Sequence, residues 1–214
     1  MSAVTTHAHD SHAEAHDHEV PYEVQLKSNR LGLWLFLFSE IFLFGALFVT
    51  RFVLWGNTRP ELSQEVGLFA TSILLFSSYF MYRSEVGAAH GDQKTFLRSA
   101  LIAAGLGLLF LLSVIVLEWN VFGLSGEIAG IEIFGHLKPS DGVYGGVFFA
   151  MTGMHALHVI SGVFLILVIW WNGRKRRFTP ERHWGVEGTA IYWHYVDVVW
   201  IFFYPALYLM GQPV

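Results

Sequence analysis

The chain has 214 residues, of which 54% are hydrophobic and 14% charged, with a formal net charge of −4. Soluble domains carry about 25% charged residues, so most of this surface must face lipid rather than water. The chain has no cysteine, which excludes disulfides, iron–sulfur clusters and thiolate-ligated copper within it.

The first segment, residues 1–26, is polar and rich in histidine. Its histidines are spaced irregularly among Ala, Asp and Glu, at His7, His9, His12, His16 and His18. Imidazole suits copper, zinc and nickel, so one interpretation is a tail that collects metal ions. The other is a disordered, solvated tail without fixed geometry, and the irregular spacing favours it.

Five apolar runs follow within residues 27–214. They cover about 31–55, 66–82, 96–119, 142–171 and 189–210. Since about 20 apolar helical residues cross a bilayer, each run is predicted to be a transmembrane helix. The predicted fold class is therefore all-α, a polytopic membrane helix bundle with five transmembrane helices. Pro205 is expected to kink the fifth helix, because proline removes a backbone hydrogen bond.

The basic residues predict the orientation. If the five runs cross the membrane in turn, ten of the 13 Lys and Arg residues lie on the side of the N-terminus. Such loops stay in the cytoplasm, so the N-terminus is predicted to be cytoplasmic and the C-terminus outside. Four of these residues are consecutive, at Arg174, Lys175, Arg176 and Arg177. They are a topology anchor and also candidates for holding anionic lipid headgroups.

Ionisable side chains inside the apolar runs are the informative exceptions: Glu40, His155, His158, His194 and Asp197. Each costs about 3 kcal/mol or more in lipid, so they are expected to face protein. At a rise of about 1.5 Å per residue, all but His155 are expected in one broad layer. His155 and His158 are three residues apart and are expected on one helix face, as are His194 and Asp197.

Two kinds of role fit these residues. The histidines could ligate haem, or they could make interhelical hydrogen bonds worth about 1 kcal/mol each. Two histidines on one helix face cannot reach opposite sides of a haem, which favours a structural polar layer. Glu187, near a helix end, is assigned to the same layer and is expected to be solvated. Glu40 and Asp197 could relay protons. Glu40 has no cation beside it in sequence, so burial favours its neutral form.

Four motifs resemble one family, subunit III of the haem–copper terminal oxidases. Leu37–Phe44 (LFSEIFLF) resembles its buried-glutamate helix, and Ser140–Phe149 (SDGVYGGVFF) the start of its next-to-last helix. Thr152–Gly162 (TGMHALHVISG) is similar to its histidine motif. Gly185–Gly188 (GVEG) and Tyr192–Trp200 (YWHYVDVVW) match its final helix.

This resemblance, over about residues 27–212, implies a non-catalytic subunit without haem, copper or another metal of its own. It implies direct contact with subunit I and a place in one complex with subunit II, and these partners are expected to carry the haem and copper of a proton-translocating respiratory enzyme. The family is credited with protecting the active site during turnover and with supporting proton uptake. The carboxyl at Glu40 would react with hydrophobic carbodiimides, and phospholipid would occupy clefts. Nothing implies nucleic acid.

The chain resembles the short, five-helix form of the family, which is typical of bacterial oxidases and predicts a bacterial inner membrane. The long form has two further leading helices, so the lipid cleft that they help to build is in doubt. The residues of the motifs favour the branch of the family that oxidises cytochrome c, while a quinol oxidase subunit stays an alternative. An accessory protein of nitric oxide reductase shares the fold. A small haem-binding membrane cytochrome and a proton-coupled transporter are the alternatives from other classes.

Overall fold

The computed structural model describes residues 21–128, 131–132 and 134–214, so most of the histidine-rich tail lies outside the described residues. The described residues form five long helices: α1 (Tyr22–Trp55), α2 (Gln64–Ala89), α3 (Gln93–Ser113), α4 (Gly142–Arg174) and α5 (Trp184–Tyr204). Two π-helical turns continue them, η1 (Val114–Glu118) after α3 and η2 (Pro205–Leu209) after α5. The all-α fold class is confirmed.

Two short strand pairs complete the described structure. Strand β1 (Thr58–Arg59) pairs in parallel with β4 (Gln212–Pro213) and so joins the α1–α2 connection to the end of the chain. Strand β2 (Glu127–Ile128) pairs antiparallel with β3 (Ile131–Glu132) in the loop between η1 and α4. Neither pair builds a sheet that could form a second layer.

The helices extend beyond the apolar runs that predicted them. Helix α1 begins at Tyr22, so the tail expected to reach residue 26 is too long by five residues. Helix α2 continues to Ala89, although its apolar run ends near residue 82. The helices are longer than the apolar runs because backbone hydrogen bonding continues where the side chains become polar. Hydropathy identifies only the part of each helix that faces lipid. The α2–α3 turn comes at Gly91, which has φ of 72°, a conformation that favours glycine.

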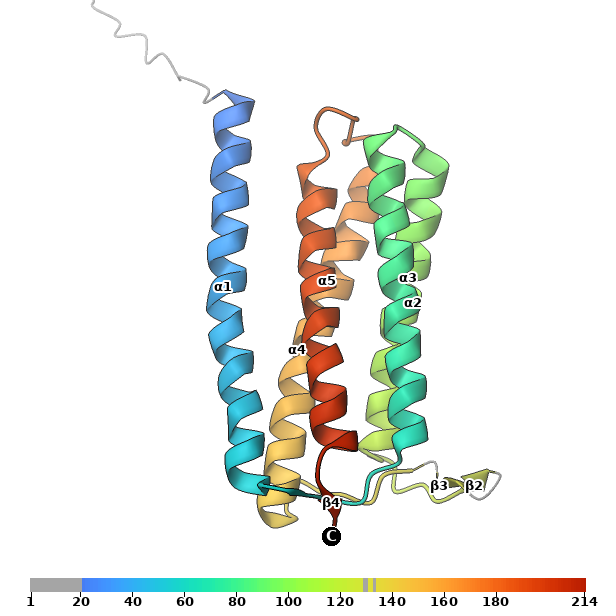
Figure 1. Cartoon of the computed structure of the whole chain (residues 1–214). Coiled ribbons are helices and arrows are strands. Elements are labelled where there is room, and N and C mark those ends of the chain that lie inside the picture. The colour runs from blue at the N-terminus through green and yellow to red at the C-terminus, as the bar shows by residue number, and fades with distance from the viewer. Residues whose placement is uncertain (1–20, 129–130, 133) are drawn as a thin grey trace, which may run out of the picture.

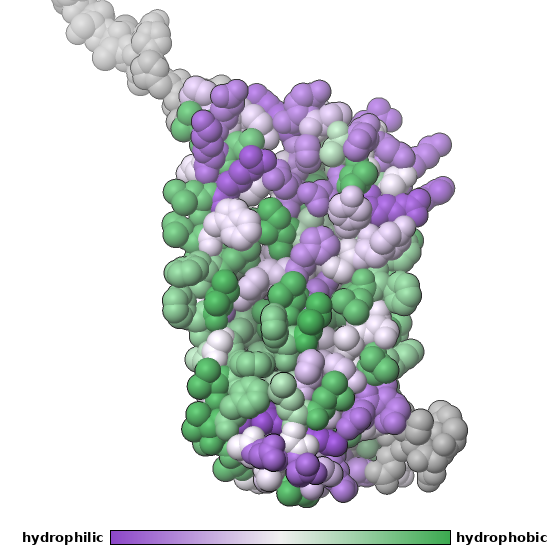
Figure 2. Space-filling model, viewed as in Figure 1, coloured by the Kyte–Doolittle hydropathy of each residue, from purple (hydrophilic) through white to green (hydrophobic). Residues whose placement is uncertain are grey.

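Four segments are long and apolar enough to cross a membrane: α1, α2, α3 with η1, and α4. Helix α5 is rich in Tyr, Trp and His and is not among them, but it packs against both α2 and α4 within the bundle. Figure 2 shows an apolar band around the middle of the molecule and polar residues gathered at both ends. The chain is therefore a membrane protein.

The helices run side by side along one direction, with α2, α3, α4 and α5 grouped and α1 at the edge (Figure 1). The start of α1, the α2–α3 turn and the α4–α5 loop share one end, here called the N-terminal end. The opposite end holds the C-terminus. Helices α2 and α3 approach closely, since Ser77 Oγ donates to the Ala103 carbonyl at 2.9 Å. Small side chains permit such an approach in lipid.

Pro205 changes the hydrogen-bond register of the last helix. The Met210 N–H donates to the Pro205 carbonyl at 2.9 Å, five residues back, which makes η2 a π-turn. The Trp119 N–H does the same to Val114 at the end of α3. The disturbance expected at Pro205 thus takes the form of a widened turn, and a second widened turn lies at the same end of the bundle.

Candidate functional site: a glutamate–histidine pair between α1 and α4

The bundle brings Glu40 and His158 together across α1 and α4. Glu40 Oε2 lies 3.1 Å from His158 Nε2, and the two side chains are 15% and 14% exposed. The ring of Phe44, one turn further along α1, meets the imidazole edge-on at 4.7 Å between centroids. Glu40 is therefore not a lone carboxyl, since the fold supplies an imidazole from 118 residues away.

The hydrogen-bond contacts of this pair allow two arrangements of its protons. His158 Nδ1 lies 2.8 Å from the Met154 carbonyl, which can only accept, so Nδ1 carries a hydrogen. The Nε2 atom then either accepts from a neutral Glu40 or, as an imidazolium, donates to a Glu40 carboxylate. In both arrangements the two side chains share one proton and have no net charge. The neutral Glu40 expected from burial is one of these two forms.

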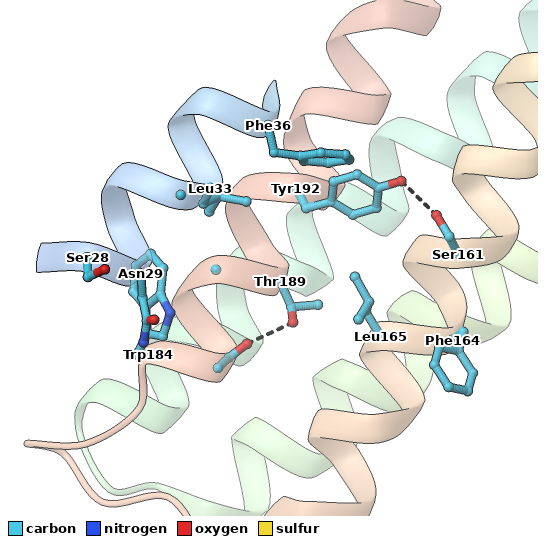
Figure 3. Close-up of a pocket in the computed structure, with 13 residues that line it drawn as sticks. Ser28, Asn29, Leu33, Phe36, Ser161, Phe164, Leu165, Trp184, Thr189 and Tyr192 are labelled. Atoms are coloured by element: carbon cyan, nitrogen blue, oxygen red, sulfur yellow. Dashed lines mark hydrogen bonds between the residues drawn. The ribbon is translucent and has the colours of Figure 1, made fainter. Parts of the chain in front are cut away.

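A cavity lies next to this pair, toward the N-terminal end. It has a volume of about 710 Å³ and is walled by α1, α4 and α5, with Leu33 and Phe36 on the α1 side (Figure 3). On its opposite wall, Tyr192 and Ser161 share a hydrogen bond of 2.6 Å between their hydroxyls. The Tyr192 hydroxyl also donates to the His158 carbonyl at 3.4 Å. The cavity therefore ends at polar groups adjoining His158.

A second hollow follows the groove between α1 and α5 on the far side of Glu40. It has a volume of about 390 Å³ and an apolar lining that includes Phe44, Gly45, Phe48 and Phe202. Both hollows are in the size range of small-molecule sites, which is about 300–1,000 Å³. The two hollows thus provide room for an apolar ligand on either side of the Glu40–His158 pair.

His194 contacts a partner that sequence reasoning missed. Its Nδ1 lies 2.6 Å from Ser78 Oγ and so links α5 to α2. Asp197 is 3% exposed and lies near the same serine, although neither carboxyl oxygen has a hydrogen bond within the described part of the chain. A serine inside an apolar run carries no sequence signal, because its hydroxyl often bonds only to its own helix.

His155 does not make the interhelical hydrogen bond expected of it. It is fully buried, and neither ring nitrogen has a partner among residues 21–128, 131–132 and 134–214. Its ring instead stacks on Trp200 at 4.8 Å and meets the edge of Phe110 at 5.7 Å. His155 thus contacts α3 and α5, whereas His158 contacts α1. Over the described residues, no three His, Asp or Glu side chains gather where they could hold a metal ion.

Known proteins are similar to this chain over most of its length. The family model described as cytochrome c oxidase subunit III matches residues 4–212. Cytochrome c oxidase subunit 3 of Rhinoceros unicornis is 33% identical over 200 residues, which cover 87% of this chain and 71% of that protein. The Bos taurus protein of the same name gives the same figures, and the Felis catus protein is 34% identical over 199 residues.

The chain belongs to the cytochrome c oxidase subunit III family. The resemblance of the four motifs is confirmed, and the match begins at residue 4 rather than near residue 27. Membership makes the chain a subunit of an oxidoreductase complex that contains other oxidase subunits. Members of this family do not generally bind metal.

Two further contacts tie α1 of this family member to α5. Glu187, expected to be solvated, pairs with Arg30 through both carboxylate oxygens, at 2.9 and 3.1 Å. Near the opposite end of α1, Arg51 is 1% exposed and donates to the carbonyls of Ala206 at 2.6 Å and Gly56 at 3.0 Å. It also donates to Met210. Arg51 is one of the three basic residues that the count of Lys and Arg leaves on the outer side, although a cation within the apolar run 31–55 was itself a signal.

The four consecutive basic residues lie on the surface at the N-terminal end. Arg174 lies over the rings of Trp170 and Trp171 at 5.0 and 5.7 Å, and Lys175 over Trp171 at 5.0 Å. Arg177 donates to the Asn172 side chain at 3.3 Å. Arg176 has a positive φ of 52°. Cations held against tryptophan at a helix end suit the membrane interface.

Proposed function

We propose that the chain is the non-catalytic subunit III of a proton-pumping respiratory cytochrome c oxidase in a bacterial inner membrane. All five helices cross the membrane, with the N-terminus in the cytoplasm and the C-terminus outside. The chain binds subunit I directly and lies in one complex with subunit II, and those partners hold the haem and copper. Family membership supports this assignment, and the basic residues gathered at the N-terminal end support the orientation.

The observation that carries the proposed role is the Glu40–His158 pair. Because it shares one proton without net charge, it can lie in lipid at a lower cost than an isolated carboxylate. Its proton can pass between oxygen and nitrogen over a single contact of 3.1 Å. A partly exposed pair of this kind, on the weakly packed helix α1, can exchange protons with a neighbour. We assign it a supporting role in proton uptake by subunit I.

Bound phospholipid is part of the same proposal. The two hollows beside α1 have largely apolar walls in which acyl chains fit. Arg174, Lys175, Arg176 and Arg177 lie exposed at the N-terminal end of the bundle, where headgroup phosphates would be. Residues 27–214, together with the start of α1 at Tyr22, form the membrane unit.

The test compares the purified oxidase with and without this chain. Preparations made through a tag on subunit I should contain the chain, as mass spectrometry would show. Both preparations are assayed for oxygen reduction with reduced cytochrome c and with quinol. We expect activity with cytochrome c at first in both, followed by faster loss during turnover and fewer protons translocated per electron without the chain. Equal lifetimes and equal proton yields would refute the supporting role.

A second measurement tests the non-catalytic assignment itself. The chain expressed without partner subunits should show no Soret absorption band, because His155 and His158 face different helices. A near-stoichiometric haem in that preparation would instead support the membrane cytochrome alternative.

A further inference from the structure

Three helix ends meet at the C-terminal end of the bundle around a cluster of buried oxygens. Glu118 is the last residue of η1, Tyr208 lies in η2, and Ser63 occupies the N-cap position of α2. Glu118 is 6% and Tyr208 1% exposed. Both Glu118 oxygens, the Tyr208 hydroxyl and the Ser63 hydroxyl are buried and have no hydrogen bond within the described part of the chain.

These oxygens border the same small cavity. Ser63, Glu118 and Tyr208 all line it, together with Val66 and Gly135. The space in which the centre of a water molecule can move there is about 10 Å³. A single water needs roughly that volume, about 10–15 Å³, and two to four polar partners. The cavity therefore has the size and the polar lining for one water molecule.

The local backbone keeps this cavity in place. A serine at an N-cap position normally accepts a hydrogen bond from its own helix, but the Ser63 side chain makes no such bond. On another wall, the Gly135 N–H donates to the Leu117 carbonyl at 2.6 Å. A Cβ atom at Gly135 would lie 2.0 Å from the Glu118 carbonyl oxygen, so only glycine closes the loop at this distance.

The ligand that fits is water rather than a metal ion. The electrostatic neighbours of the Glu118 carboxyl include the phenols of Tyr204 and Tyr208, and the Tyr208 hydroxyl lies close to the carboxyl without meeting it in hydrogen-bond geometry. Neither phenol can supply a positive charge, and a buried carboxylate without one is costly. A calcium ion takes about six to eight oxygen ligands, more than the side chains of Ser63, Glu118 and Tyr208 offer. A neutral acid, a phenol and a serine hydroxyl match the donors and acceptors of one water.

We propose that one internal water molecule is bound by Glu118, Tyr208 and Ser63. It joins the ends of α3 and α5 to the start of α2. Since each buried oxygen would otherwise lose its hydrogen bonds with solvent, the water satisfies the polar groups at both π-turns. Ser63 and Tyr208, which share no direct hydrogen bond, are coupled through it.

The first test is a cryo-electron microscopy map of the assembled oxidase at a resolution that shows waters. We expect a peak between Glu118, Tyr208 and Ser63 at hydrogen-bond distances, about 2.6–3.2 Å. An empty map there, a direct Glu118–Tyr208 hydrogen bond that closes the cavity, or a peak at metal-ligand distances of about 2.4 Å would overturn the assignment.

The second test uses a double-mutant cycle and does not depend on resolution. The apparent melting temperature of the complex is measured for Ser63→Ala, Tyr208→Phe and the double variant. We expect the two single shifts not to add, because both residues act through one water. The matched control pairs Tyr208→Phe with Ser72→Ala, since Ser72 lies on α2 and, within the described part of the chain, donates to the Leu68 carbonyl alone. The control shifts should add; additive shifts for Ser63 and Tyr208 would contradict the shared water.

Discussion

Helix α1 and the α2–α5 group are held together by different kinds of contact. Only four of the 34 residues of α1 are buried: Leu37, Phe44, Arg51 and Trp55. In its most apolar stretch 11% of the residues are buried, against 44% in each of α2, α3 with η1, and α4. The spacing of Leu37, Phe44 and Arg51 is seven residues, so α1 presents one narrow line to the bundle.

The difference shows how a helix with little packing can still have a fixed position. Lipid is as apolar as leucine, so burial alone does not drive helices together in a membrane. Helix α1 makes polar contacts at three positions along its length: Arg30 pairs with Glu187, Glu40 pairs with His158, and Arg51 donates to surrounding carbonyls. The α2–α5 group combines such hydrogen bonds, as between His194 and Ser78, with close fit between large rings and small residues. Polar changes should therefore affect α1 most, and changes of shape should affect the group.

The largest effect is expected for Arg51→Met. The variant removes one buried guanidinium and leaves carbonyls of Ala206, Gly56 and Met210 without their donor. The expected loss of stability is on the order of 3 kcal/mol. Thermal unfolding of the complex would measure it, and limited proteolysis should show a released C-terminus. Arg59→Met is the control, because among the described residues the guanidinium of Arg59 donates to the adjacent Pro60 carbonyl alone, at 3.4 Å. Equal stability of the two variants would contradict the proposed link.

The next largest loss of stability is expected for Gly162→Ala, which should disturb the packing within the α2–α5 group. A Cβ at residue 162 would lie 2.6 Å from the Trp193 ring, which is fully buried and cannot move away. Overpacking of this kind costs about 1–3 kcal/mol. Gly153→Ala, in the same helix, is the matched control, since its Cβ would lie 4.0 Å from Trp119. If the melting temperature were unchanged in both variants, the tight contact at Trp193 would not contribute to the stability of the bundle as proposed.

Glu40→Ala should have an effect of about 1–3 kcal/mol, because it leaves His158 Nε2 without a partner. Glu40→Gln retains a hydrogen-bonding side chain and should assemble normally. Labelling with a lipid-soluble carbodiimide should be strong in the wild type and absent in both variants. Oxygen reduction should continue in both, while reduced proton translocation in Glu40→Gln would show that the shared proton matters. Loss of all oxygen reduction in a fully assembled Glu40→Gln complex would refute a non-catalytic subunit.

The smallest effect is expected for Arg30→Ala. The Arg30 side chain is 50% exposed, so its pair with Glu187 should contribute less than about 1 kcal/mol. The difference from the wild type should shrink further at high salt, where exposed pairs are screened. A large, salt-independent loss of stability would mean that this end of α1 is held more tightly than its exposure indicates.

The sequence predicted the elements better than the contacts between them. Each apolar run corresponds to a helix, because hydropathy reports directly on the lipid-facing surface. The partner of Glu40 could not be found by inspecting its neighbours, since it lies 118 residues away on another helix. His155 was assigned a hydrogen bond, but its ring instead packs against the rings of Trp200 and Phe110. Of the two π-turns, η2 has a sequence signal in Pro205, whereas η1 lies within an apolar run that has no such residue.

The buried Arg51 also imposes an order on the assembly of the chain. Two of its acceptors, Ala206 and Met210, are synthesised 155 and 159 residues later. At about 5–20 residues per second, the ribosome needs roughly ten to thirty seconds to reach them. Through that interval the guanidinium must stay hydrated at the membrane surface, and α1 cannot take its final depth. Although helix α1 is synthesised before α2, α3, α4 and α5, it is therefore among the last to be fixed.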